Sequence, residues 1–210
     1  MNDFEKSLAE VLGEENLIKI QKARVGIAGA GGLGSNCVLF LVRCGFRKLR
    51  IVDSDVVEMS NLNRQFYFST QVGEKKVEAL RENLLRINPD LEIETFDERI
   101  ENGNVGTLFS ECDVVVEALD GAADKKMVVE AYMNSGKLVV AASGIAGWGE
   151  SDAITIHRIR DNFFLVGDLS SEAAPGLPPM APRVNIAAAK QADVILTYFL
   201  RNPDRGLHND

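Results

Sequence analysis

The sequence predicts an α/β fold with a doubly wound, mainly parallel sheet and an antiparallel C-terminal extension. Between residues 23 and 150, apolar runs of strand length alternate with longer segments of helical spacing. The run Val114–Val116 is apolar at every position, which is typical of a strand buried on both faces of a parallel sheet. A glycine-rich turn, GAGGLG, directly follows the first apolar run, where Rossmann-like folds place their phosphate-binding turn.

Length and composition are those of an ordinary globular domain. With 210 residues, 46% hydrophobic and 26% charged, the chain can enclose one substantial core, and we expect a single domain over residues 1–210. No apolar run approaches the ~20 residues that span a bilayer. The polar start, MNDFEKSLAE, differs from secretory and transit signals, so we expect a cytoplasmic protein without membrane contact. The net charge of -8 argues against a nucleic-acid partner, although a small phosphate ligand needs only a few local cations.

The first half of the chain contains three predicted strands separated by helices. Residues 4–22 are acidic and amphipathic and predict one or two short helices. A second helix is expected at Ser35–Cys44, because Gly45 stops an apolar segment, and a third at Gly73–Asn88, because Pro89 follows. The three predicted strands are ARVGIAGAG, KLRIVD and LEIETFDERI.

The second half begins in the same way and then changes. A helix at 102–110, the strand CDVVVEALD, a helix at 124–135 and the strand KLVVAASG continue the alternation. Beyond residue 150, AITIHRI and NFFLVGD alternate in polarity like an antiparallel pair. A loop rich in Pro and Ala follows, and the apolar segment Asn185–Leu200 predicts the last helix.

The glycine-rich turn predicts a nucleotide site. Gly29 allows the tight turn, Gly31 lets the backbone approach a phosphate, and Gly34 permits close packing of the helix on the strand. Asp53 ends the second strand, where an acceptor for ribose hydroxyls is expected. The glycines alone do not separate NAD, FAD and ATP.

A polar cluster after Asp53 favours a polyphosphate over a dinucleotide. The Arg64 guanidinium can clamp phosphate oxygens, while Asn61 and Gln65 can hold phosphate or sugar oxygens without adding charge. Lys75 and Lys76 begin the next helix and are candidate phosphate partners. Arg64 and Lys76 can equally be solvated surface charges, and only together with the glycine turn do they indicate a site.

Asp120 is the candidate metal ligand. It lies just beyond the fourth strand, at the sheet edge where ligands bind. One acid facing a polyphosphate suits Mg²⁺, which prefers one or two carboxylates with phosphate oxygens and water. The alternative role for Asp120 is to cap the following helix.

Cysteine and histidine supply no recognisable site. Cys37, Cys44 and Cys112 form no C-x-x-C pair and are expected to be small core side chains, so no structural zinc is predicted. His157 lies in a predicted strand and His208 in the tail, and neither is assigned a role.

The motifs VDSDVVEMSNLNRQ and VGEKKVEALRENLLRINP, with GAGGLG and an acid after the fourth strand, resemble the ThiF/MoeB/HesA family of ubiquitin-activating-like enzymes. The resemblance extends over nearly the whole chain. Later segments such as VVAASGIAGWGESDAI and MAPRVNIAAAKQA resemble a short ThiF subgroup tied to thiamine biosynthesis. The resemblance implies an ATP- and Mg²⁺-dependent adenylyltransferase. Its partner would be a small ubiquitin-like sulfur carrier protein of the ThiS type, activated at its C-terminal Gly-Gly carboxylate.

The same resemblance implies a role for each matching position. Gly32 would approach the phosphates, Asp53 the ribose, and Asn61 and Arg64 the triphosphate. Gln65 would support them, Lys76 would bind phosphate and Asp120 would hold Mg²⁺, so that Arg64, Lys76 and Asp120 carry catalysis. The carrier carboxylate is already ionised, so positioning and charge neutralisation suffice and no general base is required.

Three departures from the family pattern qualify these expectations. The chain lacks the two C-x-x-C pairs that bind zinc in larger members. The expected crossover loop, Ser170–Arg183, contains no cysteine, so adenylation is expected to be the whole reaction. Residues 1–20 contain no arginine to reach across a dimer, although family members are commonly homodimers. In addition, Gly121 stands where the family usually has Asn.

Three other functions remain open from the sequence. An NAD-dependent oxidoreductase would use the glycine turn and Asp53 but would leave Arg64, Gln65, Lys76 and Asp120 without a role. A non-catalytic module could keep the nucleotide site and dock a ubiquitin-like partner. Adenylation of a carboxylate on a modified tRNA base is disfavoured by the acidic charge balance.

Overall fold

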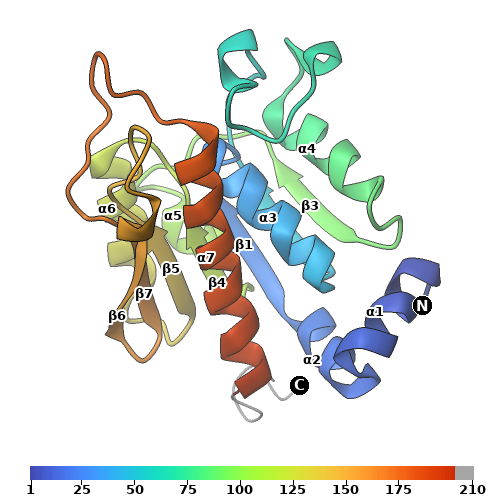
Figure 1. Cartoon of the computed structure of the whole chain (residues 1–210). Coiled ribbons are helices and arrows are strands. Elements are labelled where there is room, and N and C mark those ends of the chain that lie inside the picture. Colours follow the sequence, from blue (N-terminus) through green and yellow to red (C-terminus); the bar gives the residue numbers. More distant parts are fainter. Residues whose placement is uncertain (202–210) are drawn as a thin grey trace.

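The computed structural model, which describes residues 1–201, contains a seven-stranded sheet with helices on both faces (Figure 1). The strand order is β3-β2-β1-β4-β5-β7-β6, and every neighbouring pair is parallel except β6–β7. The predicted α/β class, the mainly parallel sheet and the antiparallel extension are therefore confirmed. Residues 202–210, with His208, lie outside the described residues.

The predicted alternation of strands and helices is present along the described chain. The strands are β1 (Arg24–Ala28), β2 (Lys48–Val52), β3 (Glu92–Phe96), β4 (Val114–Glu117), β5 (Leu138–Ala142), β6 (Thr155–Arg160) and β7 (Phe163–Gly167). The helices are α1 (Asp3–Leu12), α2 (Glu14–Lys22), α3 (Gly32–Cys44), α4 (Lys76–Leu85), α5 (Val105–Leu108), α6 (Ala122–Tyr132) and α7 (Ala181–Arg201). Short 3-10 turns occupy Met59–Asn61, Ser69–Gln71 and Ser151–Ala153.

Some helix boundaries differ from the predicted ones for local reasons. α4 begins at Lys76, not Gly73, because Gly73 has a φ of +93° and Lys75 is the extended N-cap. α5 is short because the Asn104 side chain accepts the Glu101 N–H and offers the backbone a turn instead of a helix. α7 begins at Ala181, not Asn185, and so includes Pro182. Proline is tolerated in the first turn of a helix, because its missing N–H would have no partner there.

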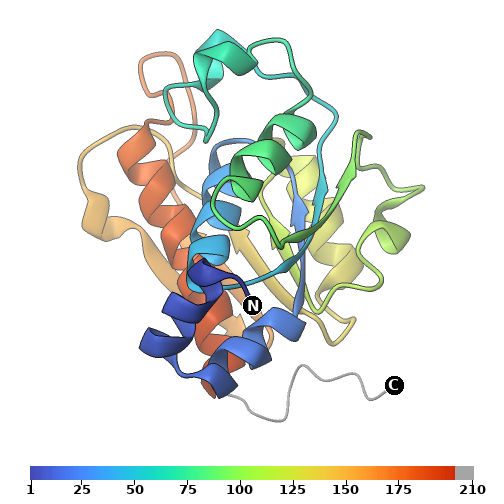
Figure 2. The ribbon, with the colours of Figure 1, turned by 90° about the vertical axis from the view of Figure 1, so that its right-hand side faces the viewer.

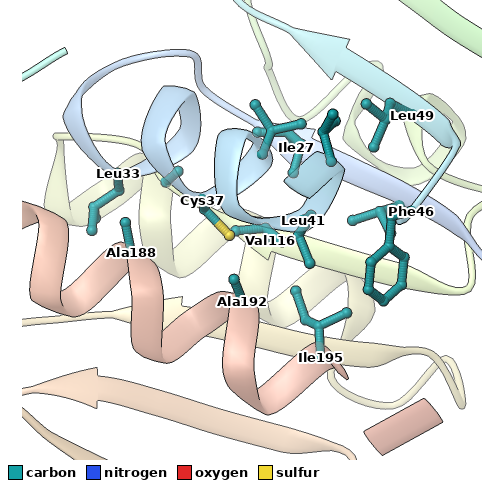
Figure 3. Close-up of a cluster of buried hydrophobic side chains, with 14 of the residues drawn as sticks. Ile27, Leu33, Cys37, Leu41, Phe46, Leu49, Val116, Ala188, Ala192 and Ile195 are labelled. Carbon is teal, nitrogen blue, oxygen red and sulfur yellow. The ribbon is translucent and has the colours of Figure 1, made fainter. Parts of the chain in front are cut away.

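Two hydrophobic cores lie on opposite faces of the sheet, as the continuous apolar strands predicted. Val114 and Val116 face the core built with α2, α3, α4 and α7, whereas Val115 faces the core built with α5 and α6. Close contact between α3 and α7 fills the larger core, in which Cys37 and Leu41 meet Ala188, Ala192 and Ile195 (Figure 3). Buried Cys37 and Cys112 confirm the core assignment, while Cys44 is only half-buried.

The topology places a crevice at the carboxyl end of the sheet. The chain runs from β1 outward to β2 and β3, then crosses to β4 on the other side of β1. Ligands of doubly wound sheets bind where the order reverses in this way, which here is between β1 and β4. The segment 54–75 and the loop between β7 and α7 both rise at this end (Figures 1 and 2). α1 lies at the opposite end, where buried Glu5 contacts Arg47 just before β2.

Candidate functional site

The glycine-rich turn has the geometry that its motif predicted. Gly29 has a φ of +97°, and a Cβ there would lie 2.9 Å from the Ala118 carbonyl oxygen. A Cβ on Gly34 would come within 1.8 Å of the Gly29 carbonyl oxygen, so only glycine allows α3 to begin so close to β1. A Cβ on Gly31 would meet nothing nearer than the Gln65 Nε2 atom at 3.9 Å. The Gly31 backbone is therefore open to a ligand.

The segment Arg64–Tyr67 is fastened to this turn by three hydrogen bonds. The Asn36 side chain donates to the Arg64 carbonyl oxygen at 2.8 Å, and the Phe66 N–H donates to the Ser35 hydroxyl at 3.0 Å. The Tyr67 hydroxyl donates to the Ala30 carbonyl oxygen at 2.7 Å, and burial raises the pKa of this phenol well above its usual range. Two stretches that are 28 to 37 residues apart in sequence therefore form one rigid wall.

Asp53 and Lys76 face a common cavity at the end of β1 and β2. The Ala30 N–H donates to Asp53 Oδ2 at 2.6 Å and the Asp55 N–H donates to Asp53 Oδ1 at 2.8 Å, which fixes the carboxylate. Each oxygen keeps a lone pair for a sugar hydroxyl. Lys76 is buried, with 7% of its side chain exposed, and donates to Asp55 at 2.7 Å. Asp55 is the more exposed partner, so a ligand can compete for the Lys76 ammonium.

The first cavity, of about 250 Å³, is bounded by the glycine turn and the ends of β2 and β4. Its wall includes Gly29, Gly31, Asp53 and Lys76. Acids exceed cations on its lining, because Asp55, Glu98, Asp120 and Asp124 join Asp53 against Lys76 and Arg99.

The second cavity, of about 630 Å³, lies beside the first, under the loop between β7 and α7. Arg64 and Gly32 form its wall near the glycine turn, and a Cβ on Gly32 would lie 3.0 Å from Val184 Cγ1 on α7. Small residues line much of the remainder, namely Ala122, Ala142, Gly144, Ala146 and Ala173.

Leu119 and Asp120 line both cavities, so the two spaces meet at the end of β4. The Asp120 side chain is exposed and forms no hydrogen bond or ion pair with any other residue in the described range 1–201. It does not cap α6, whose N-cap is Gly121 without a side-chain hydrogen bond, which excludes the alternative role expected from sequence. A free carboxylate between two cavities fits a ligand of Mg²⁺ that is shared with phosphate oxygens.

Other predicted site residues lie outside the cavity walls. Asn61 is buried and accepts the Glu58 N–H at 3.0 Å, which caps the 3-10 turn Met59–Asn61. Gln65 is buried beside Gly31, and its Oε1 atom has no hydrogen-bond partner among the described residues. Lys75 pairs with Asp97 at 3.1 Å, away from the first cavity. His157 lies in β6, where its ring contacts the Gly167 carbonyl oxygen, and it lines neither cavity.

Sequence reasoning missed two buried ion pairs, of which the first reaches the second cavity through Lys125. Glu117, at the end of β4, binds Lys125 of α6 through both carboxylate oxygens at 3.1 Å. Arg183 of α7 binds Asp168 beneath the loop between β7 and α7. No local signal indicated the first pair, because Glu117 and Lys125 are eight residues apart and belong to a strand and a helix.

Burial and hydrogen bonding have opposite effects on the acids of these pairs. Burial raises the pKa of Glu117, even though Lys125 and the Leu119 N–H act against it. Burial also acts to raise the pKa of Asp168. The backbone N–H groups of Ser171 and Ser170, followed by Arg183, outweigh it and hold that pKa well below the usual range. Asp168 is therefore a fixed anion at neutral pH.

Two further features of the described chain bear on the kind of site. Among residues 1–201, no helix combines the length and apolar character needed to cross a membrane. In the same range, no three or more His, Cys, Asp or Glu side chains converge to hold a metal by themselves.

The chain is similar to known proteins over most of its length. Two proteins called adenylyltransferase and sulfurtransferase UBA4 are among its relatives. The Candida glabrata protein is 34% identical over 143 residues, which are 68% of this chain and 33% of the relative. The Eremothecium gossypii protein is 35% identical over 144 residues, covering 68% and 32%. The chain therefore spans about a third of the length of these relatives.

Solved structures share the fold at lower identity. The Escherichia coli tRNA N6-threonylcarbamoyladenosine dehydratase TcdA in complex with ATP superposes with a TM-score of 0.86 at 20% identity, covering 95% of both chains. Escherichia coli MccB with AMPCPP and MccA gives a TM-score of 0.67 at 22% identity, covering 89% of this chain and 58% of MccB. The model of the ThiF family matches residues 4–197, and the chain belongs to that family.

Proposed function

We propose that this protein is an ATP-dependent adenylyltransferase that activates the C-terminal glycine carboxylate of a small ubiquitin-like sulfur carrier. The observation that carries the proposal is the meeting of two cavities at Asp120. One holds the glycine turn, Asp53 and Lys76, which suit a nucleotide. The other offers a separate approach to the same point, as a reaction between a nucleotide and a second substrate requires.

The first cavity would hold ATP in a defined orientation. Asp53 would accept the ribose hydroxyls, since its carboxylate is already oriented by two backbone N–H groups. The Gly31 backbone and the start of α3 would lie against the phosphates. Lys76 would exchange Asp55 for a phosphate oxygen. The acids of this cavity would repel a bare triphosphate, and Asp120 would hold a Mg²⁺ that supplies the countercharge.

The second cavity suits an extended peptide end. Its volume of about 630 Å³ and the alanine and glycine residues on its wall leave room for a peptide main chain. A C-terminal Gly-Gly would therefore reach Asp120. Arg64 lies on this wall, and its guanidinium, which donates to the Ser60 carbonyl oxygen and to Asn63 Oδ1, would exchange these partners for the reacting groups.

The reaction then needs little covalent chemistry from the protein. One carboxylate oxygen of the carrier attacks the α-phosphorus, the bond from that phosphorus to the bridging oxygen of the β-phosphate breaks, and pyrophosphate leaves. The product is an acyl adenylate. Because the attacking carboxylate is ionised at neutral pH, Arg64, Lys76 and Asp120 need only position the groups and balance charge.

Relatives support this proposal in different degrees. The UBA4 proteins are called adenylyltransferases, and TcdA and MccB bind ATP or AMPCPP. The name of TcdA instead points to tRNA, but a net charge of -8 disfavours a nucleic-acid partner here. We propose a ThiS-type carrier, a cytoplasmic site of action and a homodimer. With no cysteine between residues 168 and 183, we propose that adenylation is the whole reaction.

ATP–pyrophosphate exchange with several Gly-Gly-ended carriers tests the function. We expect carrier-dependent exchange, and its loss in Arg64→Ala and Asp120→Ala without a change in melting temperature. Arg158→Ala is the matched control, since the Arg158 side chain is 63% exposed on the far edge strand β6. Full activity in either site variant would refute the assignment. Nucleotide binding without exchange would favour a non-catalytic module, and NAD binding in place of ATP would favour an oxidoreductase.

A further inference from the structure

A buried ion pair stands at the end of β4, next to the point where the two cavities meet. Glu117 is 1% exposed, and the Lys125 ammonium lies 3.1 Å from each of its carboxylate oxygens. The same ammonium donates to the Ala142 carbonyl oxygen at the end of β5, also at 3.1 Å. The Leu119 N–H donates to Glu117 at 2.8 Å. Lys125 is therefore held by the ends of two neighbouring strands.

The ammonium also faces the second cavity. Lys125 belongs to its wall, and 24% of the side chain is exposed. Among the described residues that line this cavity, Arg64 and Lys125 are the cationic ones, whereas Asp120 and Glu172 are anionic. A carboxylate that enters the cavity thus meets one acid at the junction and one compact, fixed cation beside it.

The ammonium makes three hydrogen bonds, so binding one more acceptor requires that a single N–H serves both Glu117 oxygens. A lysine ammonium carries three N–H donors. The two Glu117 oxygens are equidistant, so one N–H can be shared between them, and a second goes to Ala142. The third can point into the cavity.

Stabilisation of the fold does not by itself explain why Glu117 and Lys125 form a buried pair. A buried ion pair rarely stabilises a fold more than apolar side chains of similar size. Glu117 is nevertheless buried, at the cost of its solvation, and its clear effect is to fix the Lys125 ammonium in one place.

We propose that Lys125 binds the carboxylate of the acyl substrate in the second cavity, with Glu117 as the residue that positions the ammonium. The inference rests on the proposed function, because it assigns the group that holds the second substrate. One carboxylate oxygen would be held by Lys125, and the other would remain free to attack the nucleotide. Lys125 lines only the second cavity, so its effect is confined to the acyl substrate.

The direct test is binding of a short fluorescent peptide ending in Gly-Gly, compared with the same peptide as its C-terminal amide. Wild-type protein should bind the free acid about tenfold more tightly than the amide, and Lys125→Met should remove that preference. Lys125→Arg should restore part of it. Lys126→Met is the control, because Lys126 is the next residue of α6 and is 72% exposed. Equal binding of acid and amide by wild-type protein, or a preference that survives in Lys125→Met, would overturn the inference.

A second variant separates binding from folding. Lys125→Met leaves Glu117 buried without its partner and lowers stability, whereas Lys125→Met combined with Glu117→Gln removes both charges. We expect the double variant to melt near the wild-type temperature and still show no preference for the acid. A restored preference in the double variant would show that Lys125 acts only by neutralising Glu117, against the proposal.

Kinetics then distinguish this inference from the adenylation proposal. In ATP–pyrophosphate exchange, Lys125→Met should raise the KM for the carrier about tenfold and leave the KM for ATP within about twofold. An equal rise in both constants would contradict a role confined to the acyl substrate. If wild-type protein prefers the free acid but catalyses no exchange with any carrier, the carboxylate site stands and the adenylation proposal fails.

Discussion

The buried Arg183–Asp168 pair gives the sharpest stability prediction, because it ties three segments of the chain together. Arg183 lies in the first turn of α7, and its guanidinium binds Asp168, which directly follows β7. It also donates to the Gly149 and Glu150 carbonyl oxygens at 2.9 and 3.2 Å. Only 5% of the Arg183 side chain and 11% of the Asp168 side chain are exposed. Arg183→Met keeps much of the volume and removes all of these contacts.

The expected loss follows from burial and from the bonds that remain. Breaking a buried ion pair on one side costs about 3–5 kcal/mol. Asp168 keeps the N–H groups of Ser170 and Ser171 at 2.8 and 2.7 Å, so we expect the lower end, about 3 kcal/mol. For a domain of this size that is a fall of ~6–12 °C in melting temperature. Urea unfolding gives the free energy, and differential scanning calorimetry gives the temperature.

A matched control separates burial from loss of charge. Arg158→Met also removes one arginine from an ion pair, but Arg158 and its partner Asp161 are 63% and 77% exposed. The control should lose at most about 1 kcal/mol. If Arg183→Met and Arg158→Met proved equally stable, the argument that Arg183 holds these three segments together would be wrong.

Two further predictions concern the glycine turn and acid stability. Gly34→Ala should destabilise the protein by about 3 kcal/mol and weaken ATP binding, because its Cβ would lie 1.8 Å from the Gly29 carbonyl oxygen. Gly103→Ala, with nothing within 4 Å of its Cβ, should be nearly neutral in the same urea titration. The pKa of Asp168 is lowered in the folded state, so its contribution is complete at neutral pH and is lost as the pH falls below about 3.9. Wild-type protein should therefore lose more stability between pH 7 and about pH 3 than Asp168→Asn does, and equal losses would contradict this account.

Much of the fold was readable from the sequence because its signals are local. Continuous apolar runs such as Val114–Val116 indicated buried parallel strands, and the two cores on either side of β4 confirm that reading. The turn geometry of Gly29 and Gly34 followed from the steric limits of the motif. Asp53 and Lys76 share a cavity. The sequence indicated this, because Asp53 ends the second strand and Lys76 begins the helix that follows.

The remainder depends on contacts between segments that are distant in sequence. Nothing local indicated that Lys76 would bind Asp55, or that Glu117 would be buried against Lys125. The second cavity is formed by α3, the end of β5 and the loop between β7 and α7, so it exists only in the folded chain. The roles expected for Asn61 and Gln65 stay predictions, because their side chains line neither cavity in this structure.

Tracing oxygen through the reaction tests the central claim most directly. A Gly-Gly-ended carrier labelled with oxygen-18 in its terminal carboxylate is incubated with the protein, ATP and Mg²⁺, and the acyl product is then hydrolysed at its carbonyl carbon. If the carboxylate attacks the α-phosphorus where the two cavities meet, the AMP released will contain one labelled oxygen. Label in inorganic phosphate, or AMP without label, would contradict the account.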